Sequence, residues 1–302
     1  MKKIKKIKQV FKSIPTIEGA GVHLKRAFGF HQVPHFDPFL LLDDFHSDKP
    51  DQYLAGFPWH PHRGIETITY VLEGDVVQGD SIGNKGFIRP GDVQWMTAGS
   101  GIIHQEMPKG DKKGRLWGSQ LWANLPASHK MMEPRYREVL STHIPEVKLA
   151  SGVRVKIICG EIAGVKGPVQ DIITQPRYLD VTVDADRETQ LPIADDHTVF
   201  AYVIQGSAYF DQEHDAYTYT IAGVNYFDFK NSGTMKAGSC ILFAEGDTIS
   251  VKTEDEVVRF LFISGKPSLK PVAWYGPIVM NTQEELKTAF KEFEEGTFIK
   301  GR

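Results

Sequence analysis

Residues 66–74 read ETITYVLEG and residues 198–206 read TVFAYVIQG, so a similar pattern of apolar and polar positions, ending at a glycine, occurs twice in one chain. Downstream, residues 90–93 read PGDV and residues 237–240 read AGSC, in the same order relative to the first pair. A pattern that returns in this way is the sequence mark of a repeated structural unit. The two halves of the chain are therefore predicted to be copies of one unit.

Each copy is predicted to be built of β-strands, because short apolar runs alternate with Gly, Pro, Asp and Asn along the chain. The runs are Ile65–Leu72, Val93–Met96, Val153–Ile158, Thr198–Ile204, Ile241–Ala244 and Val257–Ile263. Many short strands at regular spacing are typical of a barrel or a sandwich. The expected fold class is thus all-β.

A single helix is predicted near the C-terminus, where Thr282 and Glu285 have the spacing of a capping box. Apolar residues then follow at helical spacing, and Gly296 ends the helix: Leu286, Ala289, Phe290 and Phe293. We expect this apolar stripe to pack on a barrel, with a partner-binding helix as the alternative.

The bulk composition excludes several classes of protein. The 302 residues carry a formal net charge of −3, and 41% are hydrophobic and 24% charged. These values are typical of a globular protein and give no overall attraction to nucleic acid or to an anionic membrane. The N-terminal segment is nonetheless rich in lysine: Lys2, Lys3, Lys5, Lys6, Lys8 and Lys12. We interpret it as a solvated first strand, with a nucleic-acid or targeting role as the alternative.

The expected location is the cytoplasm. No apolar run has the length and flanking residues of a secretory signal or of a membrane span. Cys159 and Cys240 each lie inside an apolar run, so we expect two buried thiols in a reducing compartment rather than a disulfide.

The residues with the strongest chemical signal are His60 and His62, followed later by His104 and Glu106. In a β-strand, residues i and i+2 point to the same face with Cα atoms about 6.7 Å apart. Two neighbouring strands could therefore bring three imidazoles and one carboxylate to a single point. Such ligands suit Fe, Mn, Ni, Cu or Zn and leave coordination positions open. The pattern predicts a metal site.

The repeat provides a test of this prediction. Aligned without gaps on the repeated segments, the second copy has other residues at the four ligand positions: Pro192, Ala194, Val251 and Thr253. The two copies share the residues that build strands, whereas the candidate ligands occur in one copy only. We infer that the candidate ligands serve chemistry rather than the fold.

Two features leave alternatives open. Glu66 has the same parity as His60 and His62 if the strand is continuous, so it could replace Glu106 as a ligand, accept an imidazole N–H, or pair with Arg63; we favour the latter two. Four tryptophans flank the metal segments: Trp59, Trp95, Trp117 and Trp122. They either pack in the core or line a site for a flat apolar ligand.

Four longer stretches carry a resemblance to known proteins: residues 36–45 (FDPFLLLDDF), 57–70 (FPWHPHRGIETITY), 91–108 (GDVQWMTAGSGIIHQEMP) and 276–285 (GPIVMNTQEE). They resemble the pirin family of the cupin superfamily. The resemblance implies two jelly-roll cupin barrels in tandem. Residues 1–140 would form an N-terminal metal-binding domain, and residues 141–302 would form a C-terminal metal-free domain that includes the C-terminal helix.

The family pattern implies which residues bind the metal. Pirin-like proteins use the residues that match His60, His62, His104 and Glu106, whereas the general cupin pattern uses a glutamate that falls at Glu66. The expected cofactor is one divalent transition metal, with iron first and Mn, Ni, Co, Cu or Zn as alternatives.

The resemblance also implies two classes of function. The first is a quercetin 2,3-dioxygenase, in which a flavonol-like molecule and O₂ react with release of CO, and Glu106 is the catalytic base as well as a ligand. The second is an iron-binding redox sensor or transcription cofactor that acts by binding a protein partner. Neither implies a membrane or direct contact with nucleic acid.

Overall fold

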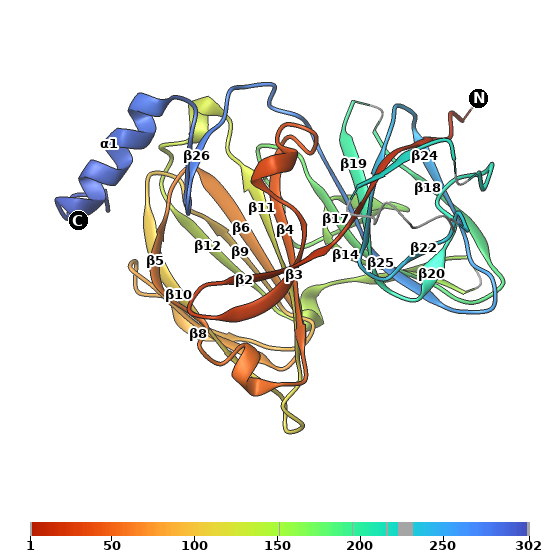
Figure 1. Ribbon diagram of the computed structural model, residues 1–302, viewed down its shortest axis with the longest axis horizontal. Coiled ribbons are helices and arrows are strands. Elements are labelled where there is room, and N and C mark those ends of the chain that lie inside the picture. Colours follow the sequence, from red (N-terminus) through yellow and green to blue (C-terminus); the bar gives the residue numbers. More distant parts are fainter. Residues whose placement is uncertain (1, 151, 195, 216, 223–231, 301–302) are drawn as a thin grey trace. The chain divides into compact units, whose positions relative to one another are not determined.

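The computed structural model describes residues 2–150, 152–194, 196–215, 217–222 and 232–300. Over these residues the fold is all-β apart from one α-helix and short 3-10 turns, as expected from the sequence. The chain divides into two compact units (Figure 1). We call Pro15–Ser141 with Ser268–Arg302 the first unit, and Met1–Ile14 with Thr142–Pro267 the second unit.

The first unit contains a seven-stranded sheet, a four-stranded sheet, a hairpin and the helix. Its strands and helix are β2 (Ile14–Glu18), β3 (Val22–Phe28), β4 (Phe39–Ser47), β5 (Phe57–His62), β6 (Ile65–Glu73), β7 (Asp75–Asp80), β8 (Lys85–Ile88), β9 (Val93–Thr97), β10 (Ile102–Lys109), β11 (Leu116–Asn124), β12 (Arg135–Val139), β26 (Ala273–Tyr275), β27 (Ile278–Met280) and α1 (Gln283–Glu294). The larger sheet has the order β12-β9-β6-β11-β4-β3-β2, and the smaller one β5-β10-β7-β8.

The second unit is built around an eight-stranded sheet with the order β13-β14-β17-β25-β19-β23-β1-β21. Its strands are β1 (Ile7–Lys12), β13 (Glu146–Ala150), β14 (Val153–Cys159), β15 (Glu161–Ile162), β16 (Val165–Lys166), β17 (Arg177–Val183), β18 (Glu188–Pro192), β19 (Thr198–Gln205), β20 (Ser207–Ala208), β21 (Thr220–Ala222), β22 (Met235–Lys236), β23 (Ser239–Phe243), β24 (Thr248–Lys252) and β25 (Val258–Gly265). Alternate residues of β14, β17, β19 and β25 contribute to one apolar cluster, as the two-residue period of a strand requires. Cys159 and Cys240 are both buried and form no disulfide among the described residues, as predicted.

The units do not follow the simple division at residue 140 that the sequence indicates. The N-terminal strand β1 pairs with β23 and β21, so it belongs to the second unit. Conversely, the helix and the hairpin β26–β27 belong to the first unit. The sequence-based boundaries assigned each terminus to the barrel nearest to it in the sequence. Contacts with distant segments instead assign the N-terminal strand to the second unit and the C-terminal segment to the first.

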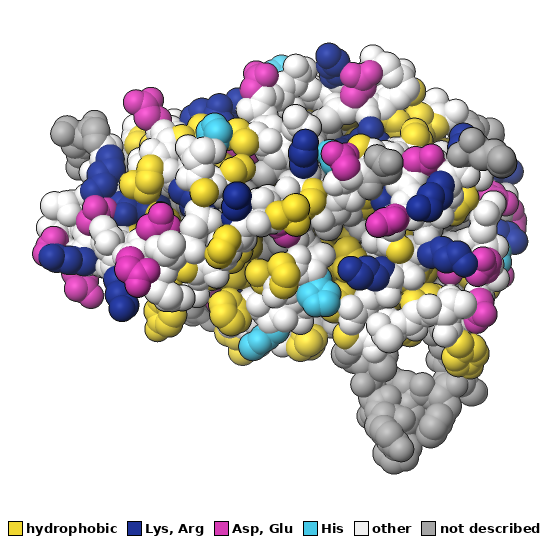
Figure 2. All heavy atoms as spheres, turned by 90° about the horizontal axis from the view of Figure 1, so that it is seen from above, with side chains coloured by type: hydrophobic (Ala, Val, Ile, Leu, Met, Phe, Trp, Pro, Cys, Tyr) yellow, Lys and Arg dark blue, Asp and Glu magenta, His cyan; other side chains and the backbone are white. Residues whose placement is uncertain are grey.

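Strand β1 confirms a first strand in the lysine-rich segment, but the buried Lys5 contradicts the expectation that these lysines are solvated. Lys5 is buried and its Nζ donates to the carbonyl of Ala244 at 3.1 Å. Lys3 and Lys6 form ion pairs with acidic residues of the second unit, Glu245 and Glu213. The face shown in Figure 2 has basic and acidic side chains interspersed over its surface. No helix among the described residues is long and apolar enough to cross a membrane.

The helix α1 is capped as the sequence predicts. The backbone N–H of Glu285 donates to Thr282 Oγ1 at 3.1 Å, and the N–H of Thr282 donates to Glu285 Oε2 at 3.1 Å. The apolar stripe packs in a cluster with the hairpin and with Ile103 of β10, while Phe293 is partly exposed. The helix therefore covers part of the first unit.

A glycine brings the C-terminal segment against the turn between β5 and β6. Gly64 has φ of +77°, and a Cβ at this position would collide with the carbonyl oxygen of Val279 in β27. The N–H of Val279 in turn donates to the carbonyl of Arg63 at 3.1 Å. Glycine is required here both for its positive φ and for the close backbone approach.

If the C-terminal segment is an integral part of the first unit, truncating its central buried residue should destabilise that unit. Ile278 is fully buried in the cluster that joins β27, α1 and β10. We expect Ile278→Ala to lower the free energy of unfolding by about 2–5 kcal/mol, measured by urea denaturation. The matched control is Leu269→Ala, at a side chain that is 84% exposed, which should change the stability little. Equal stabilities of the two variants would contradict this role of the segment.

Candidate metal centre

Strands β5 and β10 bring the three predicted histidines together. The strands are antiparallel neighbours, and His104 stands directly opposite His60 while Ile102 stands opposite His62. One ligand nitrogen from each imidazole lies within 4.8 Å of the others, and Nε2 of His60 is 3.1 Å from Nε2 of His62. Among the described residues, this is the group of three with metal-ligand spacing.

The orientation of two rings is fixed by backbone carbonyls. Nδ1 of His60 lies 2.8 Å from the carbonyl oxygen of Pro58, and Nδ1 of His62 lies 3.0 Å from that of Pro277. A carbonyl can only accept, so each Nδ1 carries the proton and donates, and the lone pair is left on Nε2. Hydrogen bonds of this kind hold a metal-ligating imidazole in the correct tautomer and orientation.

His104 provides the test of whether these residues fit a metal. Its side chain is fully buried, yet neither Nδ1 nor Nε2 has a hydrogen-bond partner among the described residues. Buried polar atoms without a partner are uncommon, and an ion is one reason for them. A coordinated cation would satisfy the nitrogen that faces the other two imidazoles, so the donor set fits a divalent transition metal.

The imidazoles of His62 and His104 are held in the form that binds metal. Burial, together with the neighbouring imidazoles, lowers the pKa of His62 and of His104 well below the usual value of 6.5. Both rings are therefore neutral at pH 7. Neutral imidazole is the ligand form of histidine, so a cation meets no competing proton at these two residues.

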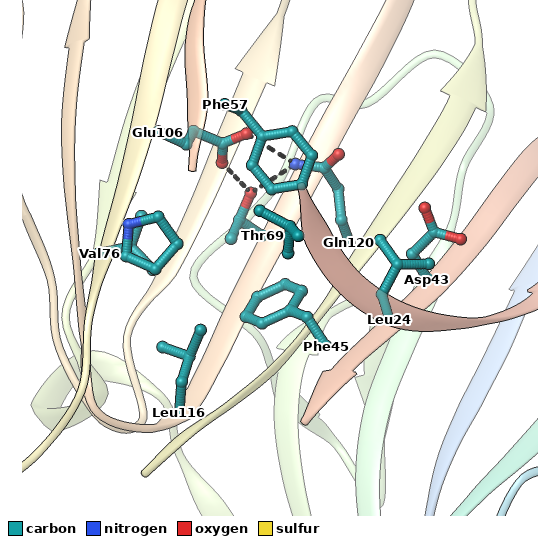
Figure 3. A pocket seen from close by; sticks show the side chains of 11 residues that line it. Leu24, Asp43, Phe45, Phe57, Thr69, Val76, Glu106, Leu116 and Gln120 are labelled. Carbon is teal, nitrogen blue, oxygen red and sulfur yellow. Dashed lines mark hydrogen bonds between the residues drawn. The ribbon is translucent and has the colours of Figure 1, made fainter. Parts of the chain in front are cut away.

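Glu106 is buried beside the cluster and anchored by two donors. Its Oε2 lies 4.0 Å from Nε2 of His104. Thr69 Oγ1 donates to Oε1 at 2.9 Å, and Gln120 Nε2 donates to Oε2 at 2.9 Å (Figure 3). The indole N–H of Trp122 donates to Gln120 Oε1 at 3.1 Å, which sets the orientation of that amide. Glu106 therefore lies next to His104, with its two carboxylate oxygens bonded to Thr69 and Gln120.

Glu66 does not join this group, and both interpretations that we favoured for it are wrong. The turn at Gly64 carries the chain from the smaller sheet into the larger one, so counting alternate residues from His62 across it fails. Strand alternation then puts Glu66 and Thr69 on opposite faces of β6. Thr97 Oγ1 donates to Glu66 at 2.7 Å, and burial raises the pKa of the Glu66 carboxyl.

A pocket of about 780 Å³ opens in front of the histidines. His60 and His62 line it, and so do two of the four tryptophans predicted as candidates, Trp59 and Trp122. The other two lie elsewhere: Trp95 is buried in the strand face that carries Glu66, and Trp117 stacks on His46 at 4.7 Å between ring centres.

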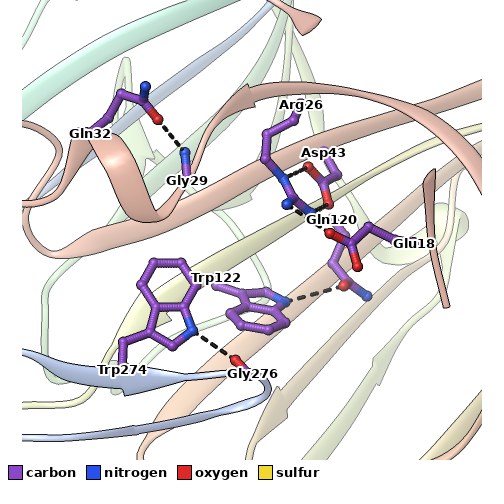
Figure 4. Close-up of polar contacts among 9 residues, drawn as sticks. All are labelled: Glu18, Arg26, Gly29, Gln32, Asp43, Gln120, Trp122, Trp274 and Gly276. Carbon is purple, nitrogen blue, oxygen red and sulfur yellow. Dashed lines mark hydrogen bonds and ion pairs between the residues drawn. The ribbon is translucent and has the colours of Figure 1, made fainter. Parts of the chain in front are cut away.

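Several residues of the pocket come from segments that the sequence did not indicate. The hairpin β26–β27 contributes Trp274, whose ring centre is 5.9 Å from that of Trp122, and Tyr275 beside it. On another wall, Arg26 donates to both carboxylate oxygens of Asp43 at 2.8 and 2.7 Å and to Glu18 at 2.8 Å (Figure 4). Of these residues only Asp43 lies in one of the family stretches, residues 36–45, and nothing local marks the others.

Arg63 holds the C-terminal segment against the turn that follows β5. Its guanidinium is 2% exposed and donates to the carbonyls of Ser100 and Phe298 at 2.7 and 2.8 Å. Nη1 forms an ion pair with Glu292 of α1 at 2.7 Å. The same segment supplies the Pro277 carbonyl that orients His62. Glu292, not Glu66, is therefore the partner of Arg63.

The second unit has no counterpart of the site among its described residues. Strands β18 and β24 pair as β5 and β10 do, with Thr189 opposite Val251 and Leu191 opposite Ile249. The gapless alignment with Pro192 and Ala194 was wrong, because five residues, 193–197, join β18 to β19 where two, 63–64, join β5 to β6. The candidate ligands still occur in one copy only, since the corresponding residues are apolar or hydroxyl side chains and Leu191, Ile249 and Val251 pack in the apolar core.

The fold and the site together define a two-barrel protein of the cupin type in which one barrel has a histidine cluster and the other has an apolar interior. The family model described as pirin matches residues 21–123, and the model described as the pirin C-terminal cupin domain matches residues 178–299. The chain belongs to the pirin family.

Known proteins of this family are similar to the chain over nearly its whole length. The chain is 40% identical to a pirin-like protein of Caulobacter vibrioides, covering 98% of this chain and 99% of the relative. It is 37% identical to the pirin of Homo sapiens, covering 91% and 88%. A solved structure of quercetin 2,3-dioxygenase from Acinetobacter baumannii superimposes with a TM-score of 0.85 at 29% identity, covering 98% of both chains.

If Arg63 positions the segment that orients His62, its removal should weaken both the first unit and its affinity for metal. We expect Arg63→Ala to lower the free energy of unfolding by about 3–5 kcal/mol, since two carbonyls lose their donor and Glu292 keeps only its ion pair with Lys300. The Kd for Ni²⁺, measured by calorimetry, should rise about 10- to 100-fold.

The control for this prediction is Arg154→Ala in the second unit. Arg154 forms a half-exposed ion pair with Asp184, and a pair of this kind contributes about 0–1 kcal/mol. It should leave the Kd for Ni²⁺ unchanged. An Arg63→Ala protein with unaltered metal affinity would contradict the positioning role.

Proposed function

We propose that this protein is a metal-dependent dioxygenase that cleaves a flavonol such as quercetin with release of CO. The observation that carries the proposal is a cluster of three imidazoles, two of which line a pocket with aromatic walls, with the buried Glu106 carboxylate next to the third. The similarity to the quercetin 2,3-dioxygenase structure supports the same reaction class.

In this proposal His60, His62, His104 and Glu106 hold one divalent transition metal, with iron as the expected ion. Three nitrogen ligands and one oxygen ligand are also acceptable to Mn, Ni, Co, Cu and Zn. When bound, the metal would supply Lewis acidity toward the flavonol hydroxyl and a redox-active centre for O₂. Elemental analysis of protein from its native host identifies the ion.

The walls of the pocket suit a flat aromatic substrate. Its volume of about 780 Å³ falls within the usual range for small-molecule sites, about 300–1,000 Å³. Trp59 is half exposed at the rim, and Trp122 lies edge-on to His62 with 5.1 Å between ring centres. Rings placed in this way can stack on a planar substrate and hold its reacting end at the histidines.

The polar wall favours a substrate without negative charge. Glu18 and Asp43 supply two carboxylates, and Arg26, the cation between them, is already bonded to both. Formally this group carries one net negative charge, so it repels carboxylate and phosphate substituents. Hydroxyl groups, which can donate to the carboxylates, are accepted, and a polyhydroxylated flavonol has them.

Glu106 is assigned the role of general base. The donors Thr69 and Gln120 hold its carboxylate in place at the histidine cluster. To accept the proton of the flavonol hydroxyl it would release Gln120, which lines the aromatic pocket as well, and turn toward that pocket. In the overall reaction one flavonol and one O₂ give one depside and one CO. Both oxygen atoms of O₂ are retained in the depside, and the carbon of CO comes from the cleaved ring, so no other reductant is consumed.

The alternative is an iron-binding redox sensor that acts by binding a protein partner. Two observations favour it: the lysine-rich N-terminal segment and a second barrel whose described residues lack the histidine cluster. Lys5 is buried and Lys3 and Lys6 are paired with acidic residues, which weakens the first of these observations. A pull-down in which oxidation of the bound metal changes partner affinity would favour this alternative.

The catalytic proposal predicts turnover that depends on the cluster. Metal-loaded protein mixed with quercetin without oxygen and then exposed to O₂ should lose flavonol absorbance and release CO. His104→Ala should lose both the metal and the activity. Glu106→Gln should lower kcat about 10²- to 10⁴-fold, the usual contribution of a general base, with metal content measured in parallel. Absence of turnover with Fe, Mn, Ni, Co and Cu in turn would overturn the proposal.

The contribution of the C-terminal hairpin can be tested separately. We expect Trp274→Ala to raise KM for quercetin about 2- to 10-fold, because an aromatic pair contributes about 0.5–1.5 kcal/mol beyond its buried area. Steady-state kinetics over a range of quercetin concentrations measure this change. Tyr217→Ala, at a side chain that is 81% exposed in the second unit, is the matched control. An unchanged KM in the Trp274 variant would remove the hairpin from the substrate site.

A further inference from the structure

A second, much smaller cavity lies inside the first unit on the side of Glu106 (Figure 3). Its volume is about 20 Å³, enough for one small molecule. Its apolar lining includes Val22, Leu24, Phe45, Val76 and Leu116, which belong to one buried cluster of strands β3, β4, β7 and β11.

The cavity and the aromatic pocket meet at shared walls. Asp43, Phe57 and Gln120 line both. The histidines His60 and His62 face the pocket, whereas Glu106 faces the cavity. The hydrogen bond between Gln120 and Glu106 thus stands between the two spaces. A molecule in the cavity would be next to the candidate metal ligands without occupying the place of the flat substrate.

The chemistry of the lining favours an apolar guest over water. A buried water needs two to four polar partners. The polar side chains at the edge of the cavity are already bonded to one another or to Arg26: Thr69 and Gln120 donate to Glu106, and both oxygens of Asp43 accept from Arg26. Larger cavities with a wholly apolar lining, of about 150 Å³, remain dry and take up gases such as xenon, and the apolar side of this smaller cavity offers the same kind of surface.

We propose that this cavity is a binding site for O₂, which reaches the candidate metal centre from the carboxylate side while the flavonol occupies the aromatic pocket. The proposal rests on the proposed dioxygenase function. The reaction has two substrates of very different size, and the first unit has two spaces of very different size that meet at Gln120. The proposal assigns one substrate to each space. It also implies that a bound flavonol does not block the entry of O₂.

Xenon-pressurised crystals of the full chain test the site without requiring activity or metal. We expect one xenon atom bounded by Val76, Leu116 and Phe45. An ordered water hydrogen-bonded to Glu106 at that position, with no xenon, would overturn the proposal. Because this readout is independent of turnover, its failure is distinct from failure of the proposed function.

Kinetics with a filled cavity test whether the guest is O₂. Val76→Ile adds one methylene to the lining and should abolish the xenon peak. Its KM for O₂ should rise roughly threefold to tenfold, equivalent to about 0.6–1.4 kcal/mol of lost binding, with KM for quercetin unchanged. Val22→Ile on another strand provides a second variant where the first fails to fold.

The matched control is Val71→Ile. Val71 is fully buried in the same cluster but does not line the cavity, so this change should leave both KM values and the xenon peak as they are. Loss of xenon with an unchanged KM for O₂, or an equal rise of both KM values, would overturn the assignment to O₂.

Discussion

The antiparallel register of β5 and β10 is the constraint on which the site depends, because it sets His104 directly opposite His60. Side chains alternate along a strand, so His62 and Glu106 follow on the same face two residues further along their own strands. A slip of one residue would turn His104 and Glu106 away from the interior together. Strand β7 pairs with the other edge of β10 and fixes the register from that side as well, with Asp80 opposite His104.

Contacts between residues far apart in the chain also help to position the candidate site. The turn after β5 needs Gly64 because the backbone of β27 passes directly against it. Arg63 then joins that turn to the loop at Ser100 and to the C-terminal helix, and Pro277 bonds to a ring nitrogen of His62. The orientation of one candidate ligand is consequently set by a segment more than two hundred residues later in the sequence.

The features that the sequence predicted correctly depend on residues close together in the chain, and those that it missed depend on distant contacts. The all-β class, the capped helix and the grouping of His60, His62 and His104 depend on local spacing and were predicted from it. The inward direction expected for Glu66 from strand parity is wrong, because the two-residue period does not continue through a turn that changes sheets. Trp274 and the Arg63–Glu292 pair depend on contacts between distant segments, for which a single sequence has no local signal.

A comparison of the two units shows how the candidate site reduces apolar packing in the barrel that contains it. In the second unit, Leu191, Ile249 and Val251 occupy the place of the ligand strands, and they belong to one continuous apolar cluster. In the first unit, the described apolar residues fall into separate clusters, one around Val71 and Val76 and another around Ile65 and Met96. Buried imidazoles and a carboxylate contribute less to stability than the aliphatic side chains they replace. The C-terminal segment offsets this loss, since Val279 packs in the second of these clusters and Arg63 anchors the segment. The C-terminal segment, residues 268–302, belongs to the first unit and not to the barrel that precedes it in the sequence. We infer that it stabilises a barrel whose interior is partly polar.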